Sequence, residues 1–467
     1  MKVGLSEVVI TPPVGTSLVG YFEDRKSTGI HDNLLAQTIL FETRETMVAL
    51  ITCDLVALLP ETILETRGLI TKILPIPSDN IFIHTTHTHT GPATVSSFGA
   101  EKDEEYLKFL PELLSGSVQE AFHNLVPGRV GFGSGKEEGV SFNRRYRMKD
   151  GTVRTNPGGG DLWETIMDPH PSLPPTRGRN KVGGNPDIVK PVGPIDPEVG
   201  VIKIEDEDGR LRAILVNFAC HLDTVTGNLI SADYAGVLRQ VIRKVKGDDV
   251  LVGFFCGTSG NINHVNFQTG NLKTGYFAHT RWLGTILAGE VLAVAEKIDC
   301  APVSVLKSAS ANLEVLIRKP KPEELKLARK LKEVGPEGLT GEEKLEWERR
   351  NNLFGDEIAW ARELILVVEE GKEKEKVPVG AFRLNDSAVA FLPGEVFVEF
   401  GLRIKSESRF KPTLVFQMVN SGLGYIPTRE AFSQGTGYEE RLARSSKLAP
   451  EAGDLITDTA LKLLMQI

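Results

Sequence analysis

Six short apolar runs, each followed directly by polar side chains, restrict most strongly how this chain can fold. Their length and their content of β-branched residues are typical of buried strands. The runs are Met47–Cys53, Asn80–His84, Ala213–Cys220, Val250–Cys256, Ala388–Leu392 and Thr413–Val419. Between some of them, apolar residues at helical spacing predict helices over Glu105–Leu125, Ala235–Lys246 and Phe277–Ile298. Strands that alternate with helices predict an α/β fold in which mixed β-sheets are covered by α-helices.

Two segments depart from this alternation. Residues 152–200 are dense in Pro and Gly and predict a long loop, of a kind that is usually functional or disordered. Residues 322–376 are rich in Glu, Lys and Leu and predict a helical arm. A solvated helical excursion is the favoured interpretation of this arm, and a lid or an oligomer contact is the alternative. A length of 467 residues alone would favour two or three domains, but we expect a single catalytic α/β domain over residues 1–467.

Charge and hydropathy exclude several classes of partner. The formal net charge of −8 gives no basic patch for nucleic acid or for an anionic membrane surface. The opening sequence, Met1 to Gly15, has no continuous apolar segment of a secretory signal. No apolar stretch approaches the roughly 18 to 20 residues of a transmembrane helix. The sequence therefore predicts a cytoplasmic protein without a transmembrane segment.

The residues that follow the apolar runs predict a metal site. His84, His87, His89 and His221 lie at or just beyond two of these runs, and Glu395 follows a third. Imidazole nitrogen with carboxylate oxygen is a ligand set that Zn²⁺ prefers. In extended backbone, His87 and His89 would point the same way, as two ligands or as a ligand and its neighbour. Any one histidine is more often a hydrogen-bonded core residue, but together they favour a zinc site beyond the carboxyl ends of the strands.

Two further residues are candidates for catalysis. Ser259 lies in a Gly-Thr-Ser-Gly loop that partly resembles a nucleophile elbow, but Asn261 stands where that motif requires glycine. A serine hydrolase that uses Ser259 is therefore an alternative rather than the main hypothesis. Arg144 follows a Gly-rich turn and precedes the Pro/Gly-rich loop. It is either a surface arginine or an active-site arginine.

Five blocks of sequence resemble the neutral/alkaline (non-lysosomal) ceramidase family. They occur in the order of that family, between residue 8 and about residue 440, and match its N-terminal catalytic domain only. The block around the two neighbouring histidines, Thr-His-Thr-His-Thr-Gly-Pro, is specific, and the others are individually weak. The blocks are Val9–Gly15, Thr86–Pro92, Phe218–His221, Pro393–Glu395 and Gly424–Thr428.

The resemblance implies a zinc amidase that cleaves the N-acyl bond of a small-molecule or lipid-like amide by metal-activated water. Zn²⁺ suits this chemistry because it lowers the pKa of bound water to about 7 and polarises a carbonyl. The resemblance also implies roles for individual residues. His89 would transfer a proton, and Arg144 and Tyr438 would support the carbonyl oxygen. The implied zinc ligands are His87, His221, Glu395 and Tyr425.

Two positions depart from the family pattern. Asn261 and Asn263 stand where the family has an aspartate and a serine. These departures leave the substrate open. They also leave an alternative from another class, a non-catalytic or weakly active ligand-binding homologue of the same fold.

Overall fold

The structure is a computed structural model that describes the chain except for residues 22–23, 159–183, 274, 276, 355–356 and 436. Two sheets form its centre. The large sheet has the strand order β16 (Leu251–Cys256), β14 (Leu211–Phe218), β13 (Glu198–Asp206), β8 (Val126–Lys136), β1 (Lys2–Val9), β5 (Leu35–Glu42), β6 (Met47–Cys53), β7 (Ile81–Thr85), with β18 (Ala301–Pro302) beside β8. The small sheet has the order β19 (Leu306–Leu316), β20 (Lys374–Leu384), β21 (Ser387–Phe391), β23 (Thr413–Phe416).

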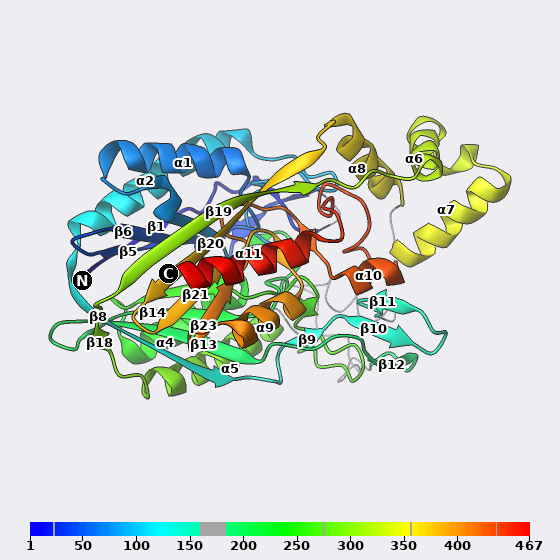
Figure 1. Ribbon diagram of the computed structural model, residues 1–467. Coiled ribbons are helices and arrows are strands. Elements are labelled where there is room, and N and C mark those ends of the chain that lie inside the picture. The colour runs from blue at the N-terminus through cyan, green and yellow to red at the C-terminus, as the bar shows by residue number, and fades with distance from the viewer. Residues whose placement is uncertain (22–23, 159–183, 274, 276, 355–356, 436) are drawn as a thin grey trace.

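The two sheets pack face to face around an aromatic core. Phe82 of the large sheet stacks on Phe391 of the small sheet at 4.1 Å between ring centroids, and Phe255 stacks on Phe416 at 4.4 Å. Because side chains alternate along a strand, the opposite face of each sheet is also apolar and requires cover. On the large sheet that cover is α1 (Pro60–Ile73), α2 (Glu104–His123), α4 (Asp233–Lys246) and α5 (Ala278–Ala295). On the small sheet it is α9 (Val398–Glu407) and α11 (Ala452–Gln466), as Figure 1 shows.

This arrangement confirms the predicted α/β fold with mixed sheets covered by helices. Within each sheet, the strands of the six apolar runs form parallel pairs: β6 with β7, β14 with β16, and β21 with β23. Their carboxyl ends carry the polar residues that the sequence singled out. The helices α2, α4 and α5 begin and end within three residues of the ranges predicted for them.

The outer edge of β16 is closed by side chains rather than by another strand. Every second residue of an edge strand turns its N–H and C=O groups away from the sheet, and buried groups of this kind require partners. Side chains of β5, β6 and β7 supply them. Gln37 Nε2 donates to Val252 O (2.9 Å), Thr52 Oγ1 donates to Phe254 O (2.8 Å), and His84 Nε2 accepts from the Cys256 N–H (3.0 Å). The two ends of the large sheet are thereby joined, which brings the segment after β7 beside the segments after β14 and β16.

The Pro/Gly-rich segment is structured at both ends, so the prediction of a loop over all of 152–200 is wrong there. Strands β11 (Val153–Thr155) and β12 (Ile188–Pro191) pair with β10 (Arg145–Met148) on its two edges, and β13 begins at Glu198. Short strands that flank a Gly-rich stretch have few apolar residues, and cross-strand pairing stabilises them instead. The part of this prediction that falls on residues 159–183 lies outside the described residues.

Helices occupy most of the described part of 322–376. They are α6 (Pro322–Val334), α7 (Gly341–Phe354) and α8 (Glu357–Glu369). Figure 1 shows α7 projecting from the body of the molecule, whereas α8 lies back against it. Trp360 of α8 is 2% exposed and its ring lies 4.6 Å from that of Phe98. Only part of this arm is therefore the solvated excursion that its composition favours.

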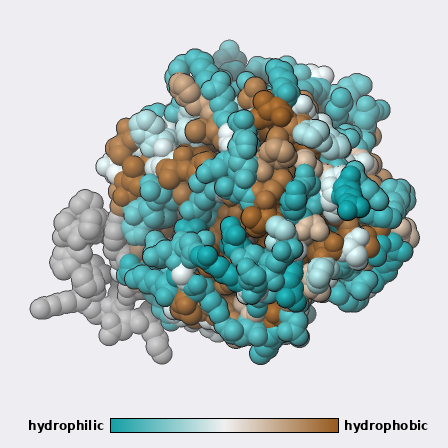
Figure 2. Space-filling model, turned by 90° about the vertical axis from the view of Figure 1, so that its left-hand side faces the viewer, coloured by the Kyte–Doolittle hydropathy of each residue, from teal (hydrophilic) through white to brown (hydrophobic). Residues whose placement is uncertain are grey.

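Hydrophilic residues cover most of the face shown in Figure 2, with apolar patches between them. In the described part of the chain, no helix combines the length and the apolar character needed to cross a membrane.

Candidate metal centre

Three histidines and one carboxylate that are distant in sequence converge in the interior. His87 and His89 follow β7, His221 follows β14, and Glu395 begins β22 (Glu395–Val396) just after β21. The ligand atoms of the three histidines all lie within 4.8 Å of one another. Glu395 Oε2 lies 3.3 Å from His87 Nε2 and 3.3 Å from His221 Nε2. All four side chains are buried.

The hydrogen bonds of the two outer ring nitrogens fix which nitrogen faces the centre. His87 Nδ1 lies 2.8 Å from the Val56 carbonyl oxygen, and His221 Nδ1 lies 2.9 Å from the Ser259 carbonyl oxygen. A carbonyl oxygen only accepts, so both Nδ1 atoms carry a proton. In the neutral imidazoles, Nε2 then presents a lone pair to the centre. Metal-binding histidines are oriented in this way by a carbonyl or carboxylate behind them.

This set of atoms fits a divalent cation. Glu395 Oε2 is a buried oxygen without a hydrogen-bond partner among the described residues, and it faces two imidazole lone pairs. Without a cation, burial lowers the pKa of His87 but the Glu395 carboxylate raises it on balance, and the resulting charge of His87 holds the pKa of Glu395 well below its usual range against burial. A cation at the centre would replace that proton on His87. Burial, reinforced by the charge of Arg144, lowers the pKa of His221. An ionised carboxylate beside a neutral imidazole is the protonation state that binds Zn²⁺.

The backbone at His87 differs from the expected extended form. His87 has a φ of 72°, in the left-handed region that non-glycine residues rarely adopt. The alternation of an extended strand is therefore not what brings His87 and His89 to one point. Their Nε2 atoms nevertheless lie 3.3 Å apart, because the chain turns at His87. Strain of this kind is concentrated at functional sites.

Tyr425 and Tyr438 lie on the side of Arg144. Strand β24 (Tyr425–Ile426) pairs in parallel with β22, and the register places Tyr425 opposite Glu395. The Arg144 guanidinium carbon lies 5.4 Å from the centroid of the Tyr425 ring and 5.1 Å from that of Tyr438. Burial raises the pKa of both phenols, so each hydroxyl retains its proton unless a cation displaces it.

Arg144 is held in a fixed orientation. Its Nε donates to Glu439 Oε1 at 3.0 Å, and its Nη2 donates to the Gly260 carbonyl oxygen at 2.6 Å. The remaining Nη1 lies 3.5 Å from His221 Nε2. Arg144 is 1% exposed, so the interpretation as a surface arginine is wrong. The guanidinium is aimed at the centre by two partners behind it.

His84, the fourth histidine of the sequence pattern, has a structural role. Its Nδ1 lies 2.8 Å from Thr52 Oγ1, and its Nε2 accepts from the Cys256 N–H. Burial, with a smaller contribution from the charge of His87, lowers the pKa of His84 to about 3. His84 is therefore a neutral residue that closes the edge of β16.

The geometry around Ser259 opposes the serine hydrolase alternative. Ser259 is fully buried, its Oγ accepts from Gln417 Nε2 at 2.8 Å, and Cys256 Sγ lies 3.4 Å away. A serine nucleophile requires a general base within hydrogen-bond reach. Among the described residues, no imidazole or carboxylate is bonded to this hydroxyl.

The two departures from the family pattern have local partners. Asn261 Oδ1 accepts from the Val398 N–H at 2.8 Å, at the start of α9, and its Nδ2 donates to Glu399 Oε2 at 2.9 Å. Asn263 Oδ1 accepts from the Val265 N–H at 3.0 Å. The amide of Asn261 therefore pairs with the carboxylate of Glu399, whereas an aspartate at position 261 would be repelled by it.

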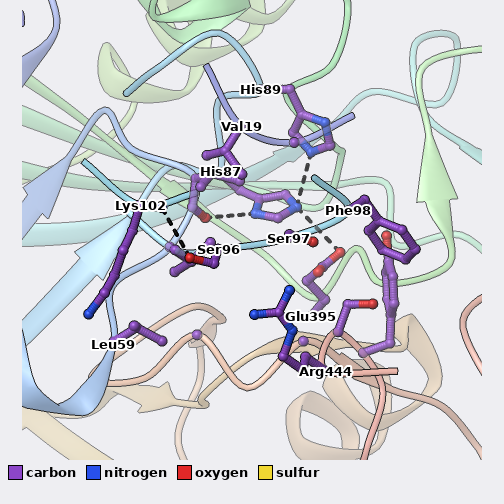
Figure 3. Close-up of a pocket in the computed structure, with 18 of the residues that line it drawn as sticks. Val19, Leu59, His87, His89, Ser96, Ser97, Phe98, Lys102, Glu395 and Arg444 are labelled. Carbon is purple, nitrogen blue, oxygen red and sulfur yellow. Dashed lines mark hydrogen bonds and ion pairs between the residues drawn. The ribbon is translucent and has the colours of Figure 1, made fainter. Parts of the chain in front are cut away.

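A cavity of about 310 Å³ opens beside the centre. His87, His89, Glu395, Tyr425 and Tyr438 line it, and Figure 3 shows the first three facing a common space. Residues that sequence patterns did not identify complete the wall. Among them are Trp360 of α8, Phe98, and the cations Lys102, Arg444 and Lys447. No spacing or motif marks them, because they reach the cavity only through tertiary packing.

Comparison with known proteins shows the fold. No protein-family model matches the chain, and no curated protein matches it in sequence. The crystal structure of neutral ceramidase from Pseudomonas aeruginosa matches with a TM-score of 0.70 and 20% identity, covering 100% of this chain and 75% of that one. A structure of ceramidase complexed with C2 matches with a TM-score of 0.67 and 17% identity, covering 99% of this chain and 74% of that one. The chain therefore has a neutral ceramidase-like fold.

Proposed function

We propose that this chain is a zinc-dependent hydrolase that cleaves a linear amide of the N-acyl type, as a ceramidase does. The observation that carries the proposal is the convergence of two imidazole lone pairs and an unbonded carboxylate oxygen at 3.3 Å in a buried site. The ceramidase-like fold supports the same chemistry. The ligands that we assign to zinc are His87, His221, Glu395 and Tyr425.

A bound zinc ion would polarise the substrate carbonyl and lower the pKa of a water molecule. The protein residues would supply orientation and proton transfer. His89 would hold and move the proton at Nε2, since burial lowers its pKa and keeps it neutral. Arg144, fixed by Glu439, and Tyr438 would donate hydrogen bonds to the carbonyl oxygen as negative charge develops on it.

The site also bears on the extent of the catalytic unit. Its lining comes from segments that follow strands of both sheets and from α8. We therefore propose that residues 1–467 act as one catalytic α/β domain, with the helical arm as part of the cavity wall.

The test combines metal content with turnover. Zinc measured by elemental analysis should be near one ion per chain and should be lost in His87→Ala and His221→Ala. The exposed His123→Ala is the matched control and should retain zinc. The zinc-loaded chain should hydrolyse members of a panel of N-acyl amides, and chelation should abolish this activity.

His89→Ala separates binding from chemistry. It should retain zinc while turnover falls by about 10²- to 10⁴-fold, the usual contribution of a general acid–base residue. Unchanged zinc in both ligand variants would refute the metal assignment. A zinc-loaded chain that binds amides but hydrolyses none of them would instead be the non-catalytic homologue.

A further inference from the structure

The cavity beside the metal centre carries more positive charge than a neutral lipid amide requires. Lys102, Arg444 and Lys447 line it, whereas the acidic residues in the described lining are Glu370 and Glu395. Glu395 belongs to the metal centre. Three of the four other charged side chains in this lining are therefore cations, each paired with a carboxylate outside the lining.

Arg444 is positioned by a buried carboxylate from the helical arm. Its Nε donates to Glu363 Oε2 at 2.9 Å and its Nη2 donates to Glu363 Oε1 at 2.6 Å. Glu363, on α8, is 1% exposed and also accepts from the Phe98 N–H at 3.1 Å. This carboxylate thus holds both a cation and an aromatic residue of the cavity wall.

The bidentate pair uses only one edge of the guanidinium. In the described part of the chain, Nη1 of Arg444 has no hydrogen-bond partner, and the side chain is 22% exposed. Figure 3 shows the guanidinium reaching into the middle of the cavity, toward the side on which His87 and Glu395 lie. A planar guanidinium with one edge fixed and one edge open is suited to bind a second carboxylate.

The two lysines extend this charge along the wall. Lys447 Nζ lies 2.6 Å from Glu375 Oε2. Lys102 Nζ lies 3.2 Å from Glu104 and 3.8 Å from Glu61, two exposed carboxylates that water screens. Both lysines favour an anion in the cavity more weakly than Arg444 does.

Part of the wall is apolar and suits an acyl chain, although Tyr21 and three serines also line the cavity. The apolar part consists of Val19, Val56, Ala57, Leu59, Val95 and Met418. Burial of aliphatic carbon against such a surface is favourable in proportion to its area. One substrate portion is thus hydrocarbon and the other is anionic.

We propose that the substrate is an N-acylated amino acid, an amide whose amine portion carries a carboxylate that Arg444 binds. This inference rests on the proposed amide hydrolysis and names its substrate class. In the reaction, water adds its oxygen to the acyl carbon and the C–N bond breaks. The products are a fatty carboxylate and a free amino acid, whose nitrogen receives the proton. With a neutral amide, only water would accept hydrogen bonds from the open edge of Arg444.

The experiment compares matched substrates on the zinc-loaded full chain. N-lauroylglycine carries the carboxylate, N-lauroylglycinamide is its neutral isostere, and N-lauroyl aminomethylphosphonate carries a phosphonate. We expect kcat/KM for the carboxylate to exceed that for the isostere by at least about tenfold, mainly through KM, as a charged hydrogen bond would give. Binding of the same compounds is measured by calorimetry, which does not require turnover.

Variants assign the preference to Arg444. Arg444→Gln would leave Glu363 buried without its cation, so the paired variant Arg444→Gln/Glu363→Gln is also made. Both should lose the preference for carboxylate, while Arg444→Lys should keep part of it. Arg403→Gln, which removes an exposed cation outside the cavity, should keep all of it.

The outcomes separate this inference from the proposed function. Equal binding of N-lauroylglycine and its isostere by the parent chain would overturn the inference even if both are hydrolysed. A preference that survives in the paired variant would also overturn it, as would a tenfold preference for the phosphonate. A chain that hydrolyses none of the three, yet prefers the carboxylate through Arg444, would support the anion site and refute the hydrolase.

Discussion

The carboxamide of Asn261 donates a hydrogen bond to the carboxylate of Glu399, with 2.9 Å between Nδ2 and Oε2. The same carboxamide accepts from the Val398 N–H. Asn261 therefore satisfies one donor and one acceptor at the start of α9, and it is not among the residues that line the cavity. The replacement of the family's aspartate is explained by this local pairing.

Asn261→Asp should destabilise the fold by about 1–3 kcal/mol at pH 8, since it sets two carboxylates against each other in a buried place. Burial already raises the pKa of Glu399. The added charge would raise the folded-state pKa of the pair further, so the penalty is present above that pKa and disappears as the pH falls below it. Urea denaturation at pH 8 and pH 5 measures the loss of stability.

The double variant Asn261→Asp/Glu399→Gln restores a donor facing an acceptor and should recover most of the stability lost in Asn261→Asp. An equal loss of stability in the double variant would contradict the pairing.

His84→Gln should flatten the dependence of stability on pH. The pKa of His84 is about 3 in the folded chain and about 6.5 when unfolded. The unfolded state therefore takes up a proton first, so this histidine contributes full stability above about pH 6.5 and progressively less as the pH falls toward 3. The variant should lose that slope and retain zinc. Its loss of stability at pH 8 should be only about 1 kcal/mol, since the glutamine carbonyl oxygen can replace the ring nitrogen as acceptor for the Cys256 N–H. Denaturation of the parent and the variant at several pH values, together with zinc analysis, tests this prediction. An unchanged dependence of the unfolding free energy on pH would show that His84 does not titrate in this way.

Ser259→Ala should leave kcat/KM within about threefold of the parent value, since its hydroxyl bonds to Gln417 and takes no part in the chemistry. Loss of that hydrogen bond should cost about 1 kcal/mol of stability. Steady-state kinetics on a cleaved N-acyl amide provides the measurement, with and without chelator. Complete loss of activity in the variant, together with activity that survives chelation, would favour the serine hydrolase.

Trp360→Ala tests whether α8 belongs to the cavity. Removal of this buried side chain should cost about 3–5 kcal/mol of stability and raise KM more than it lowers kcat, because the indole is a wall rather than a reacting group. Zinc content should not change. Leu345→Ala, an exposed substitution in α7, is the control within the same arm and should alter neither constant. Unchanged KM in Trp360→Ala would place α8 outside substrate binding.

The sequence predicts the sheets well because each strand of the six runs is buried on both faces. Met47–Cys53 is an uninterrupted apolar run, and β6 has the same bounds. The sequence cannot separate His84 from His87, since one lies at the end of β7 and the other directly after it. They differ in a hydrogen bond that His84 makes with Cys256, a residue far along the chain.

The cavity wall is less accessible to sequence reasoning. The pattern of α8 predicts a helix but not the surface on which it docks, because docking depends on Phe98 and Arg444 from other segments. The left-handed turn at His87 is similarly invisible in the sequence, since only a small fraction of histidines adopt this conformation. Tertiary contacts decide both features.

The closure of the β16 edge has a consequence for how molecules of this protein meet one another. An edge strand with unpaired backbone groups is a template on which a foreign strand can add, and such addition starts aggregation. Gln37, Thr52 and His84 occupy those groups from within the same chain. The side chains that join the two ends of the sheet therefore also deny this edge to intermolecular β-pairing.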